Sequence, residues 1–514
     1  MPILGSIIKK AYELRNIPFE MRRKTDAFTS QKKVLYKLLK KAQHTAFGEH
    51  YNFTEILKQD DFISAFQEHV PIYDYNSMFR KWWYRSLNGE AYVSWPGRVK
   101  YFALTSGTSE ASSKQIPVTG DMIRTIRKNS VRQLVSTVNY EFPIEFYQKG
   151  MLAIGGSTHL NFNGTYYEGD LSGIQAGNIP FWFQHFYKPG KRISKEHDWS
   201  TKLQEIVKKA KHWDIGVIVG VPAWIQILLE KIISEYQLNT IHDLWPNLKV
   251  YVHSGVSFEP YVKSFEKLFS KPIMYIESYL ASEGYIAYQN RLGSKGMHMV
   301  LDSGLFFEFV PFNDENFDHE GNIKQNPKAL TIDEVEEGKE YALLLSSCAG
   351  AWRYLIGDTI KFNSLEYQEI AVTGRTKHFL SICGEHLSQE NMNRAIKMLQ
   401  DEMNVEINEF TVAGIRYESL FAHKWFLGTD DVLDPQVAKE KIDCYLKKLN
   451  DDYRVERIEA VKEVFVKILP LDVFKNWMKI HGKEGGAHKF PRVLKNDKLQ
   501  EWEAYLQTQK AKPE

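Results

Sequence analysis

The chain has 514 residues, enough for about three domains at roughly 150 residues each, and its 43% apolar and 25% charged residues are ordinary for a globular protein. Lys and Arg total 66 against 64 Asp and Glu, and a net charge of +2 gives no indication of a nucleic-acid partner. Cys348, Cys383 and Cys444 form no CxxC pair and no even disulfide set, which is typical of the reducing cytoplasm.

The first predicted elements are helices. Apolar residues recur at helical spacing near the N-terminus, at Ile3, Leu4, Ile7, Ile8 and Ala11. We interpret this stripe as a helix packed on the core rather than as a membrane-surface anchor. No run of about 18 apolar residues occurs, so no membrane-spanning helix is expected. Ser30 is expected to cap a second helix, which carries Val34, Leu35, Leu38, Leu39 and Ala42.

Short apolar runs then alternate with helical stretches. The runs expected as buried strands are Met151–Ile154, Ile215–Val219, Val250–His253 and Ile273–Ile276. Between them, Ile206–Lys211 and Trp224–Tyr236 have helical patterns. This alternation predicts βαβ units around a mostly parallel sheet, and therefore an α/β fold.

The pattern changes after residue 300. The expected strands there, with few helices between them, are Leu305–Val310, Tyr341–Leu345, Thr359–Phe362 and Glu369–Val372, which indicates a β-rich subdomain. After residue 376, strands at Glu409–Ile415 and Val464–Ile468 flank a charged helix at 435–450. We therefore predict a large N-terminal α/β domain at 1–374 and a small α+β domain at 375–514.

Five motifs could carry chemistry, and the first is Thr105-Ser106-Gly107-Thr108-Ser109. It follows a strand-like Tyr101–Leu104, and Lys114 comes shortly after it. Backbone N–H groups and hydroxyls of such a loop can hold phosphate oxygens, and a Lys adds a positive charge. No GxxxxGK[ST] occurs, so this is not a Walker A loop. By itself, such a cluster is more often a plain turn.

The next two motifs follow predicted strands. Tyr279-Leu280-Ala281-Ser282-Glu283 comes just past the strand at Ile273–Ile276. Ligands bind at the carboxyl ends of parallel strands, where a tyrosine can stack on a base and a carboxylate can hold Mg²⁺. The third motif places Asp358 after Gly357 at the head of a strand, where a carboxylate can accept two ribose hydroxyls.

The last two motifs are basic and rich in glycine. Thr373-Gly374-Arg375-Thr376-Lys377 lies near the predicted domain boundary. Near the C-terminus, a Gly-rich stretch from Gly482 ends in Lys489-Phe490-Pro491-Arg492, which suits a strap that carries one cation. Each of these motifs, taken singly, is more often an ordinary loop.

The order of the five motifs is more specific than any one of them. It resembles the adenylate-forming superfamily of acyl-CoA synthetases and luciferases. Within that superfamily the chain is most similar to the auxin-responsive promoter family of acyl acid–amido synthetases, in a bacterial-type form. The short S/T-S-G-T-S loop, the Tyr-x-x-Gly-Asp form of the third motif and the stretch Leu38–Phe53 carry this resemblance, which spans about residues 30–495.

The resemblance implies an adenylate-forming fold with a mobile C-terminal domain, and it implies ATP and Mg²⁺. Thr105, Ser106, Gly107, Thr108 and Ser109, with Lys114 close by, would hold the phosphates. Tyr279 would stack on adenine beside Ala281, Ser282 would contact a phosphate, and Glu283 would bind Mg²⁺. Asp358 and Arg375 would bind the ribose, with Lys377 near a pivot. Lys489, Glu283 and Thr108 would be catalytic.

The implied reaction turns a small carboxylic acid into an acyl-AMP and passes the acyl group to an amine, for which an amino acid is expected. The alternatives are an acyl-CoA ligase and a nucleotide-binding scaffold without activity. No G-x-S-x-G or G-x-G-x-x-G occurs, which argues against an α/β-hydrolase and a dinucleotide-dependent dehydrogenase. His253, at a predicted strand end, is a candidate for the acyl-acid pocket.

Overall fold

The computed structural model describes residues 2–23, 26–105, 114–179, 183–196, 198–255, 258, 261–318, 321–325, 327–377, 379–385, 387–480 and 490–510. These residues divide by their contacts into two compact units, the first ending at Thr376 and the second beginning at Lys377. The predicted boundary lies two residues earlier, after Gly374.

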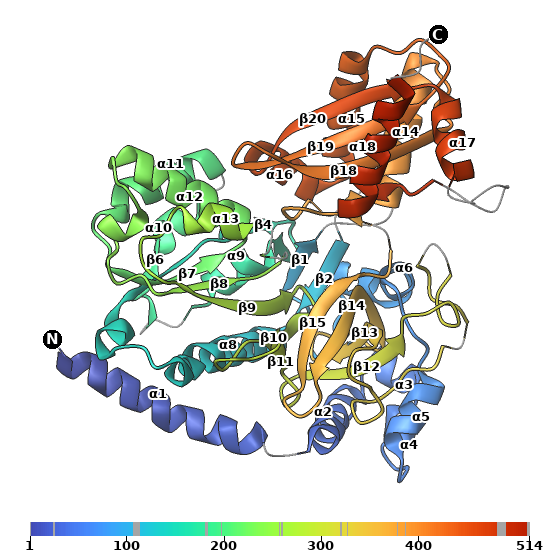
Figure 1. The fold of residues 1–514 in the computed structure, drawn as a ribbon. Helices are drawn as coiled ribbons and strands as arrows, with labels where there is room; N and C mark the ends of the chain where they lie inside the picture. The colour runs from blue at the N-terminus through green and yellow to red at the C-terminus, as the bar shows by residue number, and fades with distance from the viewer. Residues whose placement is uncertain are drawn as a thin grey trace. The chain divides into compact units, whose positions relative to one another are not determined.

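In the described part of the first unit, eleven strands form one sheet, in the order β12-β13-β14-β15-β11-β10-β9-β8-β7-β3-β6 (Figure 1). Its parallel half consists of β3 (Gly150–Ala153), β6 (Tyr187–Lys188), β7 (Ile215–Gly220), β8 (Val250–His253) and β9 (Met274–Ala281). The α/β fold with parallel strands is confirmed for this half.

The other half of the sheet is antiparallel. It consists of β10 (Gly284–Tyr288), β11 (Met297–Met299), β12 (Leu305–Pro311), β13 (Glu340–Ser347), β14 (Tyr354–Ser364) and β15 (Glu369–Arg375). These strands include the β-rich region expected after residue 300. However, they continue the same sheet, because the hairpin between β9 and β10 reverses the chain direction within it.

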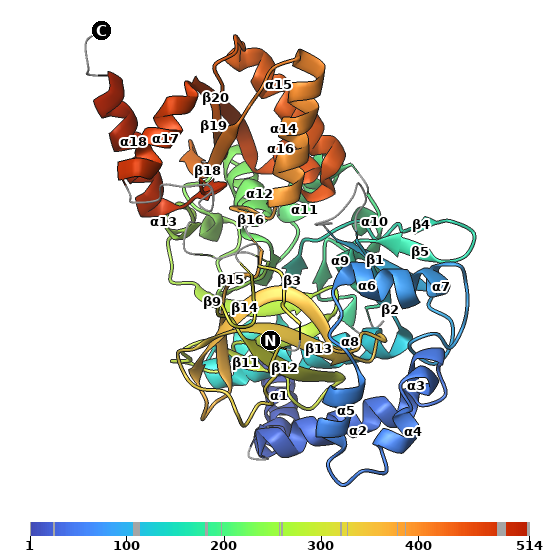
Figure 2. The same ribbon diagram turned by 90° about the vertical axis from the view of Figure 1, so that its right-hand side faces the viewer.

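Helices cover both faces of the parallel half (Figures 1 and 2). On one face lie α1 (Pro2–Arg23) and α8 (Gly120–Val135), and on the other lie α11 (Trp199–Ala210), α12 (Pro222–Glu235) and α13 (Val262–Glu266). Successive side chains of β8 point to opposite faces of the sheet, so both faces carry apolar residues that helices can cover. Val250 and Val252 join the apolar cluster under α1, whereas the ring of Tyr251 stacks on Phe265 of α13, with 5.2 Å between ring centroids.

Short helices precede and connect these elements. They are α2 (Ala27–Ala42), α3 (Ala46–His50), α4 (Phe53–Ile56), α5 (Phe62–His69), α6 (Tyr75–Met78), α7 (Tyr84–Leu87), α9 (Leu171–Gly177) and α10 (Lys191–Ser194). The helix expected after Ser30 begins earlier, at Ala27. Its cap is Asp26, whose carboxylate accepts the N–H of Thr29 at 2.8 Å, so the assignment of Ser30 as the cap is wrong.

A second, four-stranded sheet carries the hydroxyl-rich loop. Its order is β2-β1-β5-β4, formed by β1 (Tyr101–Thr105), β2 (Lys114–Val118), β4 (Asn161–Phe162) and β5 (Tyr167–Gly169). β1 and β2 are antiparallel, and Thr105 pairs with Lys114 at their ends. The first motif therefore begins at the last residue of a strand, as the sequence predicts.

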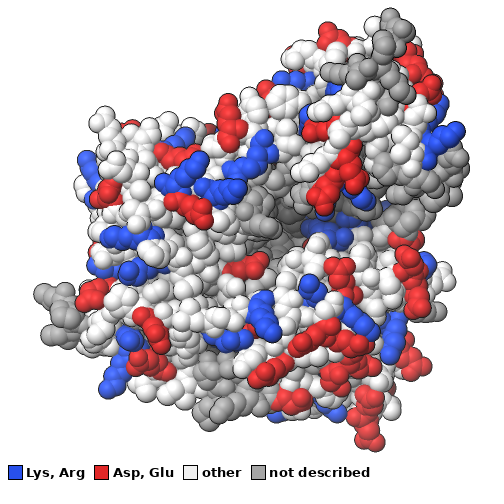
Figure 3. All heavy atoms as spheres, viewed as in Figure 1, with Lys and Arg blue, Asp and Glu red and all other residues white. Residues whose placement is uncertain are grey.

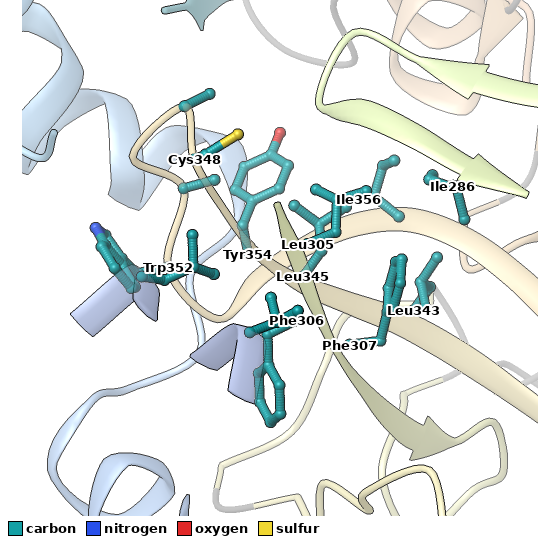
Figure 4. Packing of buried hydrophobic residues seen from close by; sticks show 14 of the residues in the cluster. Ile286, Leu305, Phe306, Phe307, Leu343, Leu345, Cys348, Trp352, Tyr354 and Ile356 are labelled. Atoms are coloured by element: carbon teal, nitrogen blue, oxygen red, sulfur yellow. The ribbon is translucent and has the colours of Figure 1, made fainter. Parts of the chain in front are cut away.

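The main core packs against the antiparallel half and is strongly aromatic (Figure 4). Trp352 and Tyr354 are buried in it, while Arg353 between them points the other way. The Arg353 guanidinium binds the buried carboxylate of Glu308 at 3.0 Å and the carbonyl of Val70 at 2.7 Å. Burying this charge is possible because both of its partners are fixed by the sheet and an adjoining helix end.

The second unit is a four-stranded sheet with helices, which agrees with the expected α+β pattern. The sheet order is β20-β19-β18-β21, with β18 (Glu409–Tyr417), β19 (Leu420–Gly428), β20 (Val461–Leu469) and β21 (Val493–Leu494). The helices are α14 (Gln389–Met403), α15 (Pro435–Leu449), α16 (Asp451–Glu459), α17 (Leu471–Ile480) and α18 (Asn496–Lys510). A short hairpin, β16 (Phe379–Leu380) with β17 (Leu387–Ser388), precedes them.

A buried contact between a carboxylate and an imidazole closes the turn of that hairpin. Glu385 accepts the N–H groups of Ile382 and Cys383 at 2.9 Å and binds Nε2 of His423 at 3.0 Å. Burial raises the pKa of Glu385, but the hydrogen bond and charge of His423 with the backbone N–H groups outweigh it and lower the pKa to about 2. The turn is thereby tied to β19.

The surface agrees with the balanced composition. On the described part of the face in Figure 3, Lys and Arg are interspersed with Asp and Glu. Within the described residues, every helix is too short or too polar to cross a membrane. Cys348 and Cys383 are buried and Cys444 is exposed, each as a free thiol.

Candidate active site

The Tyr279–Glu283 motif forms the end of β9 and the turn into β10. The sequence placed it just past a strand, but β9 runs on to Ala281, so Tyr279 and Ala281 are strand residues. Ser282 and Glu283 form a two-residue turn before Gly284. Glu283 is only 7% exposed, which excludes an ordinary surface loop.

Burial is also the main influence on the acidity of Glu283. It raises the pKa to about 7, since a charged carboxylate loses its hydration there. The charge of Lys114 opposes the shift, whereas the carboxylate of Asp358 adds to it. Glu283 therefore faces both a cation and a second carboxylate, and near neutral pH a small change in its surroundings changes its charge.

Asp358 lies inside a strand rather than at the head of one. β14 runs from Tyr354 to Ser364, and opposite Leu343 it has three residues, Ile356 to Asp358, where a regular ladder has one. Gly357 has φ +95° within this bulge, a backbone conformation that a side chain would strain. The expected glycine turn is therefore a bulge, and it sets the direction of the Asp358 side chain.

Arg375 lies directly across from Asp358. The two residues are paired in the β14–β15 ladder, and Arg375 Nε is 3.0 Å from Asp358 Oδ1. A further guanidinium N–H donates to the carbonyl of Ile356 at 3.2 Å. The side chain of Asp358 is 15% exposed and that of Arg375 28%, so part of the pair remains accessible to a ligand.

The hydroxyl of Tyr279 donates to the other carboxylate oxygen, Asp358 Oδ2. Burial raises the pKa of Tyr279 far above its usual value, and the charge of Asp358 adds to the effect, so the hydroxyl keeps its proton. The structure thus brings together three residues that the sequence assigned to the same nucleotide, from strands that are far apart along the chain.

Lys114 lies at the edge of this group. Its ammonium is 5.4 Å from the centre of the Tyr75 ring, and the backbone N–H of Gln115 donates to the Tyr75 hydroxyl at 2.9 Å. Thr105 pairs with Lys114 across the hairpin, which brings both ends of the hydroxyl-rich loop to the same place. Ser106, Gly107, Thr108 and Ser109 lie outside the described residues, as does Lys489.

Sequence reasoning gave no role to two tyrosines of this site. Tyr75 packs against Lys114. It lies on a short helix capped by Asp74, and a helix cap in the sequence does not indicate a binding site. Tyr354 stands in the core with its hydroxyl directed away from the labelled apolar side chains (Figure 4). Burial raises the pKa of Tyr354, and the charge of Glu283 adds to the effect, so Tyr354 lies close to the site carboxylate.

His253 ends β8, beside Glu277 of β9 in the ladder. It is 6% exposed, its ring stacks on Phe258 at 4.8 Å, and its Nδ1 has no hydrogen-bond partner among the described residues. Burial lowers its pKa to about 4, so the ring is neutral at pH 7. Arg492, from the last motif, binds Glu409 at 2.6 Å and the carbonyl of Phe410. Within the second unit this is a structural contact.

The fold defined by these elements is that of adenylate-forming enzymes. The chain superposes on GH3.15 acyl acid amido synthetase with a TM-score of 0.59, at 15% identity over 96% of this chain and 95% of that one. It superposes on 2-hydroxyisobutyryl-CoA ligase, in complex with 2-HIB-AMP and CoA, with a TM-score of 0.58, at 13% identity over 95% and 94% of the two chains.

Family profiles give a narrower assignment. Those of the GH3 family match its N-terminal domain at residues 20–203 and 157–274, its central domain at 298–375 and its C-terminal domain at 390–498. The chain belongs to the GH3 family, which confirms the resemblance drawn from the five motifs.

A named relative is jasmonoyl–L-amino acid synthetase GH3.5 of Oryza sativa subsp. japonica, with 29% identity over 184 residues, which are 33% of this chain and 31% of that protein. The sequence match thus spans about a third of the relative's length.

Proposed function

We propose that this protein is a ligase that adenylates a carboxylic acid with ATP and then transfers the acyl group to the amine of an amino acid. The observation that carries the proposal is the group around Asp358. One carboxylate is held between Arg375 and Tyr279, and Lys114 is close enough to Glu283 for its charge to lower the pKa of that carboxyl. A carboxylate can accept the two hydroxyls of a ribose, a lysine can bind a phosphate chain, and a second carboxylate can bind a metal ion.

Asp358 is the residue proposed to accept the ribose hydroxyls. A carboxylate has about four lone-pair sites, and Arg375 and Tyr279 use one oxygen each from within the sheet. The remaining sites can take ligand hydroxyls. Tyr279 is proposed to present its ring to adenine while its hydroxyl orients Asp358.

Glu283 is proposed to bind Mg²⁺ together with the phosphates of ATP. Mg²⁺ is usually held by one or two protein carboxylates plus substrate phosphates, and a buried carboxylate with a pKa near 7 beside a lysine fits that donor set. When bound, the ion neutralises phosphate charge. Lys114 and the loop from Thr105 to Ser109 are proposed to hold the phosphate oxygens, with Thr108 acting catalytically.

The chemistry requires two displacements. In the first, a carboxylate oxygen of the acid bonds to the α-phosphorus of ATP as the bond to pyrophosphate breaks. In the second, the amine bonds to the acyl carbon, AMP leaves and the nitrogen loses one proton. Lys489 is proposed to stabilise the charge that meets at the α-phosphate in the first step, with the second unit turning about Lys377 between the two.

The acid is proposed to bind at the carboxyl ends of β7, β8 and β9, where His253 and Phe258 stack. An aromatic wall with one neutral imidazole favours an apolar acid with few polar groups. GH3.5 of Oryza sativa is named for a jasmonoyl conjugate, and such an acid fits this description. With three unpaired thiols, the protein is proposed to work in the reducing cytoplasm.

ATP–pyrophosphate exchange across a panel of carboxylic acids tests the first step. Acid-dependent exchange is expected in the wild type and in Asp302→Asn, which weakens the ion pair between Asp302 and Arg132 of α8. Exchange should be lost in Glu283→Gln. Lack of exchange with every acid would contradict the proposal.

Mass spectrometry then identifies the products. The reactions contain an acid that supports exchange, Mg²⁺-ATP, and either amino acids or coenzyme A. Amide formation is expected. Thioester without any amide would instead identify an acyl-CoA ligase.

A further inference from the structure

Among its described side chains, helix α1 has two apolar faces, and one of them packs on the described part of the first unit. The inner face lies on the first unit: Ile8 and Tyr12 join the cluster around Phe142 and Phe146, and Asn16 donates to Asn139 at 3.0 Å. The helix approaches this surface closely, because a Cβ on Gly5 would lie 2.4 Å from the carbonyl of Ile144. These contacts fix which side of α1 faces outward.

The outer face carries large apolar side chains in solvent. Ile7 is 60% exposed, Leu14 62% and Ile17 52%. Spacings of seven and three residues place them on one side of the helix, as a stripe. The stripe predicted from the sequence at the N-terminus is therefore split: Ile8 packs on the core, as expected, while Ile7 and Ala11 face outward. In Figure 1, α1 runs along one edge of the first unit, next to α8.

The charge of this segment is unlike that of the rest of the chain. Residues 1–24 contain six Lys and Arg and two Glu, a net charge of +4, whereas the whole chain carries +2. Residues 25–514 therefore carry −2. Lys9, Lys10 and Arg15 lie on α1 among the apolar positions. The segment combines an outward apolar stripe with a local excess of cations.

We propose that the outer face of α1 binds the surface of an anionic lipid bilayer, lying in the interface without crossing it. Apolar side chains at the level of the acyl boundary, with cations beside them at the headgroups, are what such binding requires. This inference goes beyond the proposed ligase function and does not depend on it.

Charge favours a membrane over a second copy of the chain. In a twofold dimer the same patch meets itself, so Lys9, Lys10 and Arg15 would oppose the same three cations of the other copy, with one Glu13 from each side to offset them. An anionic bilayer brings charge of the opposite sign to the whole segment. The membrane is thus the occupant that satisfies both the apolar stripe and the cations.

The test uses the full chain and vesicles of phosphatidylcholine, either alone or mixed in equal parts with phosphatidylglycerol. The variant replaces Ile7, Leu14 and Ile17 by Gln, a good helix former, so that α1 keeps its inner contacts. The matched control replaces three exposed apolar residues elsewhere, Leu292, Val432 and Ile458, by Gln. Unchanged circular dichroism and thermal unfolding verify that both variants fold.

Wild type and control are expected to sediment with the mixed vesicles. The α1 variant should lose about a hundredfold in partitioning, because three large apolar side chains no longer enter the interface. Lys10→Gln with Arg15→Gln should weaken binding to mixed vesicles by roughly tenfold or more, and about 0.5 M salt should act similarly.

Three results would overturn the proposal. These are absence of wild-type binding to mixed vesicles, equal binding by the α1 variant, or a lipid-free dimer in sedimentation equilibrium that the α1 variant dissociates. The last result would assign the face to self-association instead.

Discussion

Replacing Asp358 by Ala should weaken ATP binding mainly through the lost contact with the ribose. Hydrogen bonds to a charged group contribute about 1.5–3 kcal/mol, so the dissociation constant should rise roughly ten- to a hundredfold. The side chain is 15% exposed, which keeps solvent screening small. Removing it also leaves Arg375 without its 3.0 Å partner, so part of any loss could come from a displaced guanidinium.

Deoxynucleotides separate the two contributions. Calorimetry should show that wild type binds 2′-deoxy-ATP or 3′-deoxy-ATP more weakly than ATP, because one ribose hydroxyl no longer reaches Asp358. In Asp358→Ala the difference between ATP and the deoxynucleotides should shrink strongly, since the carboxylate that accepts the ribose hydroxyls is gone. Tyr279→Phe should keep the difference, because it removes only the hydroxyl that donates to Asp358 from within the protein.

The control is Asp302→Ala. Asp302 forms a comparable pair with Arg132 in the same unit, at 2.5 Å, and no nucleotide role is assigned to it. Its ATP affinity should be that of wild type. Suppose that Asp358→Ala showed the same difference in affinity between ATP and the deoxynucleotides as the wild type. The carboxylate would then not contact the ribose, and the assignment would be wrong.

Three other predictions concern single charged groups. Lys489→Ala should slow adenylation by roughly a hundred- to a thousandfold in ATP–pyrophosphate exchange, while a synthetic acyl-AMP is still converted at the wild-type rate; equal loss in both steps would refute its role. Because the pKa of Glu283 is raised to about 7, protons compete with Mg²⁺ below that pH. The exchange rate should therefore fall as pH drops through 7, and added Mg²⁺ should move this fall to lower pH. If the pH dependence of the exchange rate did not change with Mg²⁺ concentration, the proposed metal site would be wrong. Glu385, with its pKa lowered to about 2, stabilises the fold above its ordinary pKa of 4.5, and this contribution is lost as pH falls from 4.5 through 2. His423→Ala should lower the free energy of unfolding, measured with urea at pH 7, by about 3–5 kcal/mol, and it should weaken the dependence of stability on pH below 4.5. If that pH dependence did not change, the contact between Glu385 and His423 would not be its cause.

The sequence predicted the strands of the parallel half well because their signal is local. Val250–His253 is a continuous apolar run with the bounds of β8, and a parallel strand covered on both faces needs no other pattern. Helix α12 begins at Pro222, close to the predicted start, because proline suits the first turn of a helix. Where a motif starts at the last residue of a strand, as at Thr105, its position could be read too.

Bulges and turns within strands could not be read. The apolar run at Ile273–Ile276 stops where polar and small residues begin, yet β9 continues to Ala281 because β10 pairs with it. Gly357 looked like a turn, since nothing in the sequence distinguishes a turn glycine from one inside a bulge. The burial of Glu283 could not be read either, because the groups that face it, Lys114, Asp358 and Arg375, come from three other strands.

The curvature of the sheet, which brings the site residues together, was the feature least predictable from the sequence. In the strand order β10, β11 and β15 stand between β9 and β14, so a flat sheet would separate Tyr279 from Asp358 by about 19 Å. Yet the Tyr279 hydroxyl donates to the Asp358 carboxylate. The antiparallel half must therefore curl back on itself, and the curved course of β14 in Figure 2 agrees with this. The parallel half supplies the end of β9 and the curled half supplies Asp358 and Arg375. The site exists only because a single sheet contains both, which no pattern in one segment could reveal.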